Sequence, residues 1–273
     1  MSSEIRLFTR TAVTKAKQVV ADPDAPADPV AGGGFADWAM LALHALRIEL
    51  GKSYRVTLDL LSEMPGVLGE IGLTRLPHYT SFRDWFETIP MKTWRAFLGA
   101  SVEKRSGHAA IDSTGFDRDQ PSRHYARRAH YHVRTLKVTA LVDVETLYIT
   151  DVHSTTKTPS DFRIGPQVAR RNATYLRSLA ADRGYDAKPS RDELRALGIR
   201  PLIKHRIYWA LDRAHNARMD TDRYNQRWMA ETVFSSLKRT LGATVRARSW
   251  YLEFREMLLK ATVYNLRRTV RFP

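Results

Sequence analysis

Near its C-terminal end the chain reads Tyr224-Asn-Gln-Arg227-Trp-Met-Ala-Glu231-Thr-Val-Phe-Ser-Ser-Leu-Lys238. The stretch contains no Gly or Pro and follows Asp-Thr-Asp, a typical helix start, so we expect one helix here. At about 100° per residue, one arc of roughly 60° holds four polar side chains: Tyr224, Arg227, Glu231 and Lys238. An apolar arc lies beside them, so Glu231 is expected at the rim of a core with its polar neighbours facing outward. A solvated face with spaced ion pairs is the simpler explanation of such a stripe.

The positive charge is concentrated in one part of the chain. The net charge is +15, from 44 Lys and Arg against 29 Asp and Glu. Residues 1–100 carry 11 of each sign, so the whole excess lies in residues 101–273, where Arg supplies 26 of the 33 cations. Because guanidinium groups bind phosphate oxygens in pairs, this distribution favours a polyanionic partner, most naturally nucleic acid. The alternative is a basic protein without a specific polyanion.

The composition argues against several classes of protein. The 273 residues, 43% of them hydrophobic, are enough for one large domain or two smaller ones. No apolar run of about 18 residues predicts a membrane span, and the N-terminus lacks the apolar core of a signal peptide. The absence of Cys excludes disulfides and Cys-based zinc sites, and it fits a reducing cytosol. No Walker A pattern, nucleophile elbow or dinucleotide fingerprint indicates a small-molecule substrate.

The first hundred residues are predicted to be helical. An N-terminal arm and a linker rich in Pro, Asp and Gly occupy residues 1–34, and the arm is either mobile or docked on a partner. Residues 35–105 then form an all-helical module of short elements. This module is either a helix-turn-helix reader, with Thr80, Ser81 and Arg83 in a major groove, or a simple bundle for packing or dimerisation. The net charge of zero in residues 1–100 argues against heavy phosphate contact.

From His108 onward the pattern changes to strands and helices. Strands are predicted near residues 108–112, 135–144, 146–152, 176–181 and 199–204, with helices between the later strands and after them. Three successive strands indicate an antiparallel half, and the following alternation indicates a parallel half. We therefore expect an α/β fold with a mixed five-stranded sheet flanked by helices. If the first and fourth strands lie adjacent and parallel, their terminal residues Asp112 and Asp182 meet at one edge.

Three motifs resemble the catalytic blocks of the IS5-type and IS4-type DDE transposases of prokaryotic insertion sequences. They are Ile-Asp112-Ser-Thr-Gly-Phe, Ala-Asp182-Arg-Gly-Tyr-Asp186 and Tyr224-x2-Arg227-x3-Glu231-x6-Lys238. The third motif is specific, whereas an Asp before Ser-Thr or Arg-Gly is more often a turn or a cap. The resemblance covers roughly residues 35–270. It implies a ribonuclease-H-like catalytic domain in residues 106–273, and a role in DNA-end recognition or dimerisation for residues 35–105.

The resemblance also implies a reaction. Such a transposase hydrolyses DNA at the ends of its element and then uses the freed 3′-hydroxyl to attack target DNA. Asp112, Asp182 and Glu231 are then the catalytic residues and the metal ligands. They hold two Mg2+ ions, with Mn2+ as a substitute, because this chemistry uses a pair of hard cations with oxygen ligands.

The DNA-binding surface is expected on two segments. By the resemblance, Tyr224, Arg227 and Lys238 contact the DNA at the cut end. The segment 118–134 is very basic, and it adds four DNA-binding candidates: Arg123, Arg127, Arg128 and Arg134. The same segment holds three histidines: His124, His130 and His132. These allow a metal cluster, but among so many arginines a DNA-facing loop is the preferred interpretation.

Several other residues have two plausible roles. Asp186 is expected in a structural turn rather than in a metal site. Asp143 and Asp161 are expected at a strand end and at a helix cap. Core packing is the expected role of Trp209, Trp228 and Trp250, and stacking on a flipped or frayed base is the alternative.

The expected partner is double-stranded DNA, both the terminal inverted repeats and the target. A homodimer on DNA is expected because two ends must be cut. The resemblance places the protein in the cytoplasm of a prokaryote, at the nucleoid. Two alternatives remain, a ribonuclease-H-like nuclease that cuts without joining and an inert DNA-binding protein derived from a transposase. The complete set of carboxylates disfavours the inert protein.

Overall fold

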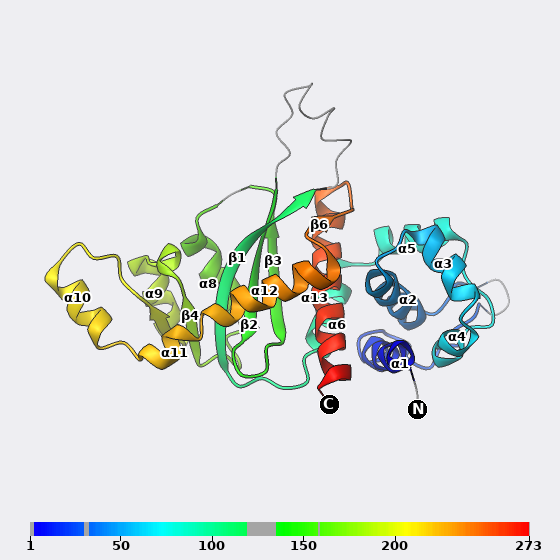
Figure 1. Ribbon diagram of the computed structural model, residues 1–273, viewed down its shortest axis with the longest axis horizontal. Helices are drawn as coiled ribbons and strands as arrows, with labels where there is room; N and C mark the ends of the chain where they lie inside the picture. The colour runs from blue at the N-terminus through cyan, green and yellow to red at the C-terminus, as the bar shows by residue number, and fades with distance from the viewer. Residues whose placement is uncertain (1–2, 30–32, 119–134, 158, 273) are drawn as a thin grey trace, which may run out of the picture. The chain divides into compact units, whose positions relative to one another are not determined.

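The chain forms two compact units, one helical and one built on a sheet (Figure 1). The computed structural model describes residues 3–29, 33–118, 135–157 and 159–272. The units are Met1–Glu103 with Leu258–Pro273, and Lys104–Met257. The predicted boundary at residues 105 and 106 is close to this division, but the predicted catalytic domain extended to residue 273. In the described ranges, none of the helices combines the length and apolar character needed to cross a membrane.

The helical unit is organised around α2. The helices of this unit are α1 (Glu4–Lys17), α2 (Asp37–Leu50), α3 (Tyr54–Ser62), α4 (Pro65–Ile71), α5 (Tyr79–Thr88), α6 (Met91–Ala100) and the end of α13 (Trp250–Arg271). Every residue of α2 from Trp38 to Ile48 is buried, as expected for a helix that other elements surround. The helix ends at Gly51, whose φ of 65° lies in the left-handed region that favours Gly.

The N-terminal arm is part of this unit. Helix α1 buries residues spaced four apart on one face: Phe8, Ala12 and Ala16. It contacts α2 and α4, and Arg6 pairs with Glu70 of α4 at 2.7 Å. The predicted linker is held as well, because Asp28 accepts a hydrogen bond from the N–H of Thr74 at 2.8 Å. The apolar face of α1 therefore anchors an arm that was expected to be mobile or docked on a partner.

The second unit is built on one mixed sheet. The strands are β1 (His108–Arg118), β2 (Leu136–Asp143), β3 (Ile149–Thr155), β4 (Ser178–Ala181), β5 (Arg200–Ile203) and β6 (Thr244–Val245). Their order is β3-β2-β1-β4-β5, and β6 pairs with β1. β2 is antiparallel to β1 and β3, whereas β1, β4 and β5 are parallel. This ribonuclease-H-like order confirms the predicted fold class.

Strand β1 is longer than predicted. The sequence suggested a strand that ends at Asp112 before a turn, but β1 continues to Arg118. It continues because the later residues stay paired with β2, where Phe116 lies opposite Leu136 and both are buried. The added length gives β6 a partner at Asp117 and Arg118. The sheet consequently has six strands rather than five.

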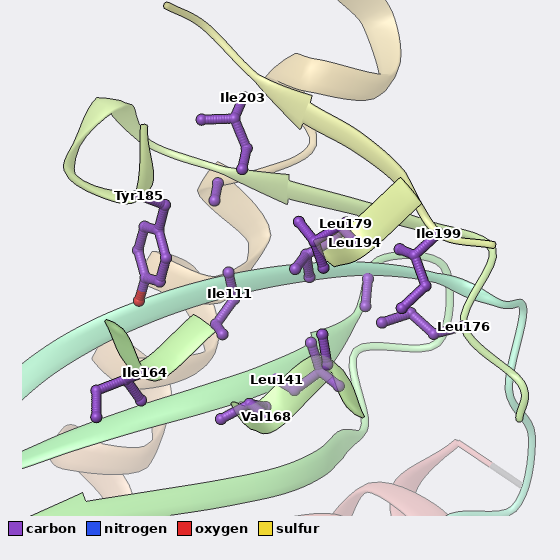
Figure 2. Packing of buried hydrophobic residues seen from close by; sticks show 13 residues of the cluster. Ile111, Leu141, Ile164, Val168, Leu176, Leu179, Tyr185, Leu194, Ile199 and Ile203 are labelled. Carbon is purple, nitrogen blue, oxygen red and sulfur yellow. The ribbon is translucent and has the colours of Figure 1, made fainter. Parts of the chain in front are cut away.

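Helices cover both faces of the sheet. On one face, α8 (Asp161–Arg171), the 3-10 helix η1 (Arg183–Tyr185) and α9 (Lys188–Ala196) enclose a core that includes Ile111 and Leu141 (Figure 2). On the other face lies α12 (Trp228–Leu241), whose Phe234 ring is centred 6.5 Å from that of Phe116. Because side chains alternate along a strand, Asp112 points the same way as Phe116. Asp112 therefore faces α12.

Candidate active site

Asp112 lies on β1, and Asp182 directly follows the neighbouring parallel strand β4. In the ladder between β1 and β4, Ala110 lies opposite Ala180. Asp112 and Asp182 each follow two residues later, so the ladder directs both residues to the same end of the sheet. An adjacent and parallel arrangement of these two strands was considered from the sequence, and the structure has it.

The carboxylate of Asp182 is fixed by the turn that follows it. Asp182 Oδ1 accepts a hydrogen bond from the N–H of Gly184 at 2.8 Å and thereby caps η1. A Cβ atom added to Gly184 would lie 2.9 Å from the same oxygen. A residue larger than Gly would therefore have to displace the carboxylate. The side chain of Asp182 is nevertheless exposed, so it is accessible to a ligand.

Glu231 comes from α12, which covers the face towards which Asp112 points. It lies in the first turn of α12 and is exposed. The predicted single helix is divided into α11 (Thr221–Asn225) and α12, with a turn between them. The predicted start at Asp-Thr-Asp is confirmed, because the Asp220 side chain accepts a hydrogen bond from the N–H of Arg223 at 3.1 Å.

Tyr224 does not lie on the outward stripe that the sequence predicted. It is 6% exposed, because α11 packs against β4 and β5 instead of extending α12 in one line. Two cations lie over its ring: Lys204 Nζ is 4.5 Å from the ring centroid, and the Arg227 guanidinium is 5.2 Å away. The outward orientation predicted for Tyr224 is therefore wrong.

The three predicted carboxylates affect one another electrostatically. Burial raises the pKa of Asp112 to about 6, and a hydrogen bond from the N–H of Ser113 offsets part of this rise. Neighbouring negative charges raise the pKa further. These charges belong to Asp182, Glu231 and Asp161. The structure thus brings the catalytic candidates from β1, the turn after β4, and α12 into one electrostatic neighbourhood.

Asp161 is the fourth acidic residue of this site, and the sequence suggested only a helix cap for it. It is the first residue of α8, and its Oδ1 lies 2.8 Å from Lys137 Nζ. Its Oδ2 lies 3.6 Å from the position that a Cβ on Gly184 would take, so Asp161 and Asp182 flank the same glycine. Asp161 comes close to Asp182 because of how α8 packs on the sheet. The spacing of residues along the sequence does not reveal this packing.

Lys238 lies beside the strand that carries Asp112. Its Nζ donates a hydrogen bond to Thr114 Oγ1 at 2.7 Å and lies 5.1 Å from the centroid of the Phe116 ring. Thr114 is two residues after Asp112 and shares its face of the sheet. A positive charge therefore lies next to the row of acidic side chains, while Arg227 is half-buried one turn before Glu231.

Two further aspartates have the structural positions that the sequence suggested. Asp186 accepts a hydrogen bond from the N–H of Arg206 at 2.7 Å and pairs with Arg191, which ties neighbouring loops together. Asp143 is the last residue of β2 and accepts a hydrogen bond from the N–H of Ser106 at 2.6 Å.

Three tryptophans are more exposed than predicted. Core packing was the expected role, but the exposed fractions are 77% for Trp209, 49% for Trp228 and 58% for Trp250. Trp209 is the N-cap of α10 (Ala210–Ala217), in which no residue is buried. Trp228 and Trp250 begin their helices, whose buried faces consist of later residues. The core prediction is therefore wrong for all three.

Several predicted residues lie outside the described part of the chain. Four of them are the DNA-binding candidates Arg123, Arg127, Arg128 and Arg134. The others are His124, His130 and His132. Their proposed contacts with DNA stay predictions.

The acidic side chains fit a hard divalent cation by their chemistry. Mg2+ prefers oxygen ligands and keeps several waters, so a few carboxylates suffice. The repulsion among these carboxylates contributes to the raised pKa of Asp112, and a bound cation would relieve it. Among the residues described, no three His, Asp or Glu side chains are already close enough to hold an ion together. An ion held by three of these side chains would therefore require them to converge further.

Comparisons with known proteins define the class of this protein. The family described as Transposase DDE domain matches residues 103–266, which include Asp112, Asp182 and Glu231. No curated protein matches the chain. Among solved structures, the chain is similar to a piggyBac transposase in a synaptic complex with hairpin DNA. The identity is 10% and the TM-score 0.48, over 96% of this chain and 73% of that chain. Because the family match covers more than half of the sequence, the chain belongs to the transposase DDE domain family.

Proposed function

We propose that this transposase hydrolyses DNA at the ends of an insertion sequence and then joins the freed 3′-hydroxyl to target DNA. One observation carries the proposal. Asp112 and Asp182 continue the same register of two parallel strands, and the charge of Glu231 acts on Asp112. Cleavage of a phosphodiester bond requires positive charge at the attacking and leaving oxygens, and three carboxylates are suited to holding the ions that supply it.

Asp112, Asp182 and Glu231 are the proposed ligands of two Mg2+ ions, for which Mn2+ can substitute. When bound, such ions lower the pKa of an attacking water or hydroxyl and stabilise the leaving oxygen. Each ligand comes from a different element, so the packing of β1, β4 and α12 sets the geometry of the site. Asp112 must be ionised to act as a ligand, and its pKa of about 6 leaves it mostly ionised near neutral pH.

Cations next to the carboxylates are proposed to bind the phosphates of the cut strand. Lys238 is held at β1 through Thr114, and Arg227 lies over the ring of Tyr224. Because Tyr224 is buried, we propose that it acts by holding Arg227 rather than as an exposed contact. The arginines of segment 118–134 extend this surface in the proposal. The excess positive charge of residues 101–273 supports such a role and predicts binding that weakens steeply with salt.

The proposed subtype is the IS5 or IS4 type of prokaryotic insertion sequence, with the protein acting as a dimer on the DNA of the nucleoid. The spacing of Tyr224, Arg227, Glu231 and Lys238 supports this assignment. For the helical unit we favour packing or dimerisation over reading of a major groove. Arg83, the proposed groove contact, is already paired with Asp84 at 2.7 Å, and a paired guanidinium is less available to a base.

The test is strand cleavage and joining on a duplex that carries the DNA flanking this protein's own gene, with Mg2+ or with chelator. The wild-type protein is compared with Glu231→Gln, which removes the charge at similar size. Glu145→Gln is the matched control, because Glu145 is exposed in the turn between β2 and β3. We expect Mg2+-dependent 3′-hydroxyl ends and joined products from the wild type and from the control, and neither product from Glu231→Gln.

The other outcomes distinguish the alternatives. Cleavage without joined products would favour a ribonuclease-H-like nuclease. Tight DNA binding without cleavage in Mg2+ or Mn2+ would favour an inert DNA-binding protein. Cleavage that persists in Glu231→Gln would contradict the role of Glu231 in particular.

A further inference from the structure

A buried tyrosine links the segments that carry the two aspartates. Tyr185 is 3% exposed and lies three residues after Asp182, at the end of η1. Its hydroxyl lies 3.0 Å from Ser113 Oγ, and Ser113 directly follows Asp112. Figure 2 shows the Tyr185 ring extending from the turn towards the strand that carries Ile111. One phenol thus joins the immediate neighbourhoods of both carboxylates.

The link continues into a third segment. Ser113 Oγ also lies 2.7 Å from Thr139 Oγ1 on β2, opposite Ser113 in the ladder. Three hydroxyl groups therefore form a chain from β2 through β1 to the turn after β4. Because Ser113 and Asp112 point to opposite faces, this chain lies on the far side of the strand from the Asp112 carboxylate. It can hold the backbone of Asp112 without occupying the site itself.

The ring of Tyr185 is fixed by close packing. A Cβ atom added to Gly165 of α8 would lie 2.9 Å from Tyr185 Cδ1 and 3.3 Å from Cε1. Tyr185 also belongs to the buried cluster that contains Ile164 and Val168 of the same helix. The Tyr185 side chain is therefore held at two places: α8 packs against its ring, and Ser113 bonds its hydroxyl.

The contact between Tyr185 and Ser113 lies beyond the last paired residues of β1 and β4. The ladder between β1 and β4 ends at Ala110 and Ala180, two residues before each aspartate. Beyond that point the two strands are no longer paired, and the like charges of Asp112 and Asp182 repel each other. A contact past the end of the ladder has to resist this repulsion, and the bond between Tyr185 and Ser113 is such a contact.

We propose that Tyr185 is a positioning residue that holds Asp112 and Asp182 at the separation needed to bind a divalent cation. The inference rests on the proposed function, because it assumes that these carboxylates are metal ligands. It assigns the task to the hydroxyl group, whereas a tyrosine that only fills the core acts through its ring. Outer residues that orient metal ligands typically alter affinity by about 10-fold to 100-fold when they are changed.

The test is Mn2+ affinity, measured by calorimetry on the full-length protein without DNA. Tyr185→Phe keeps the ring and removes the hydroxyl, and we expect binding to weaken about tenfold. Tyr175→Phe is the matched control, because Tyr175 is half-buried and donates its hydroxyl to a neighbour, Asn172. We expect both variants to lower the midpoint of thermal unfolding by a similar few degrees, and only Tyr185→Phe to change the affinity.

Ser113→Ala tests the same bond from its other end and keeps the proposal testable if Tyr185→Phe does not fold. In a double-mutant cycle, the double variant is expected to lose no more Mn2+ affinity than Ser113→Ala alone, because Ser113→Ala already removes the bond to Tyr185 together with the bond to Thr139. Unchanged Mn2+ affinity in Tyr185→Phe, with a lowered unfolding midpoint, would mean that the tyrosine is only structural. Equal Mn2+ binding by the wild type and Asp112→Asn would instead refute the proposed metal site, and the positioning role with it.

Discussion

Gly184 and Asp182 approach each other so closely that a side chain at position 184 would displace the Asp182 carboxylate. The N–H of Gly184 donates to Asp182 Oδ1 at 2.8 Å, and a Cβ on the glycine would lie 2.9 Å from that oxygen. We expect Gly184→Ala to displace the Asp182 carboxylate and to reduce DNA cleavage about 100-fold, in line with the loss from misplacing a reacting group by about 1 Å. Initial cleavage rates in Mg2+ measure the effect.

Gly99→Ala is the control for this change. A Cβ on Gly99 would have no neighbouring atom within 4 Å, and the residue lies in α6 of the other unit. Because Ala favours a helix over Gly by about 1 kcal/mol, Gly99→Ala should be neutral or slightly stabilising and should cleave DNA normally. Full activity in Gly184→Ala would show that the position of the Asp182 carboxylate tolerates a shift.

Replacing Asp112 should stabilise the metal-free protein near neutral pH. Its pKa is raised to about 6 in the folded chain, above the unfolded value of about 3.9. Ionisation of Asp112 therefore opposes folding. The stability that comes from protonated Asp112 is fully present below about pH 3.9 and is lost as the pH rises through about 6. We expect Asp112→Asn to be more stable by about 2 kcal/mol at pH 7.5 and equal to wild type at pH 3.5, allowing for solvent screening.

Urea unfolding in the presence of chelator measures this difference at the two pH values. Added Mn2+ should stabilise the wild type but not Asp112→Asn, because only the wild type keeps the full set of ligands. A variant that is less stable than wild type at pH 7.5 in chelator would contradict the charge repulsion inferred for this site.

His44 makes the helical unit sensitive to acid. The side chain is fully buried among aromatic rings, with Phe82 stacked at 4.1 Å between centroids. Burial, together with the nearby charge of Arg47, holds the pKa of His44 well below 6.5. The unfolded chain therefore takes up a proton that the folded chain does not, and stability falls as the pH drops below about 6.5. The expected slope is about 1.4 kcal/mol per pH unit from this residue.

His44→Phe keeps an aromatic ring and removes the titrating group. The difference in unfolding free energy between this variant and the wild type should grow as the pH falls from 7 to 5, and should be constant above pH 7. Other histidines contribute equally to both proteins and cancel in the difference. A difference that does not change with pH would mean that the pKa of His44 is the same in the folded and unfolded chains.

Trp209 is suited to contact DNA, because it is 77% exposed at the start of α10. Asp212 accepts hydrogen bonds from the N–H groups of Tyr208 and Trp209 at 3.0 Å each, which fixes the backbone there. We expect Trp209→Ala to leave stability within about 0.5 kcal/mol. It should weaken binding of DNA with frayed ends roughly tenfold, since stacking on a base is worth about 1–3 kcal/mol.

Trp94→Ala serves as the contrasting variant. Trp94 is 1% exposed in the helical unit, so its removal should destabilise the protein by about 3–5 kcal/mol through the cavity left behind. Fluorescence anisotropy measures the DNA affinity, and thermal unfolding measures the stability. Unchanged DNA affinity in Trp209→Ala would leave the exposed tryptophan without a role in binding.

The sequence predicted those features that depend on local pattern. Alternation of apolar residues identified the central strands, and the order of strands and helices led to the mixed sheet in which Asp112 and Asp182 are neighbours. The spacing of Glu231 within its motif identified an acidic side chain whose charge acts on Asp112. Each of these inferences uses residues close in sequence or a rule of chain topology.

The features that escaped prediction depend on packing between distant segments. Asp161 approaches Asp182 only because α8 lies on the sheet beside η1. Tyr224 is buried because α11 turns towards β4 and β5. Hydrophobicity alone suggested a core position for Trp209, but α10 has no apolar face against which it can pack. The pattern of residues along the sequence does not show which surface of the protein a helix or strand will pack against.

Helix α13 has a consequence for the order in which this protein can fold during synthesis. Residues up to Met257 belong to the sheet unit, and residues from Leu258 belong to the helical unit. In that last segment Leu259 and Leu266 are fully buried, and Asn265 donates a hydrogen bond to Ser101 at 2.9 Å. The unit that leaves the ribosome first therefore lacks one of its helices until residues 258–273 have been synthesised. A chain that lacks residues 258–273 keeps every residue of the sheet unit, yet its helical unit, which begins at the other end of the sequence, is left without one of its helices.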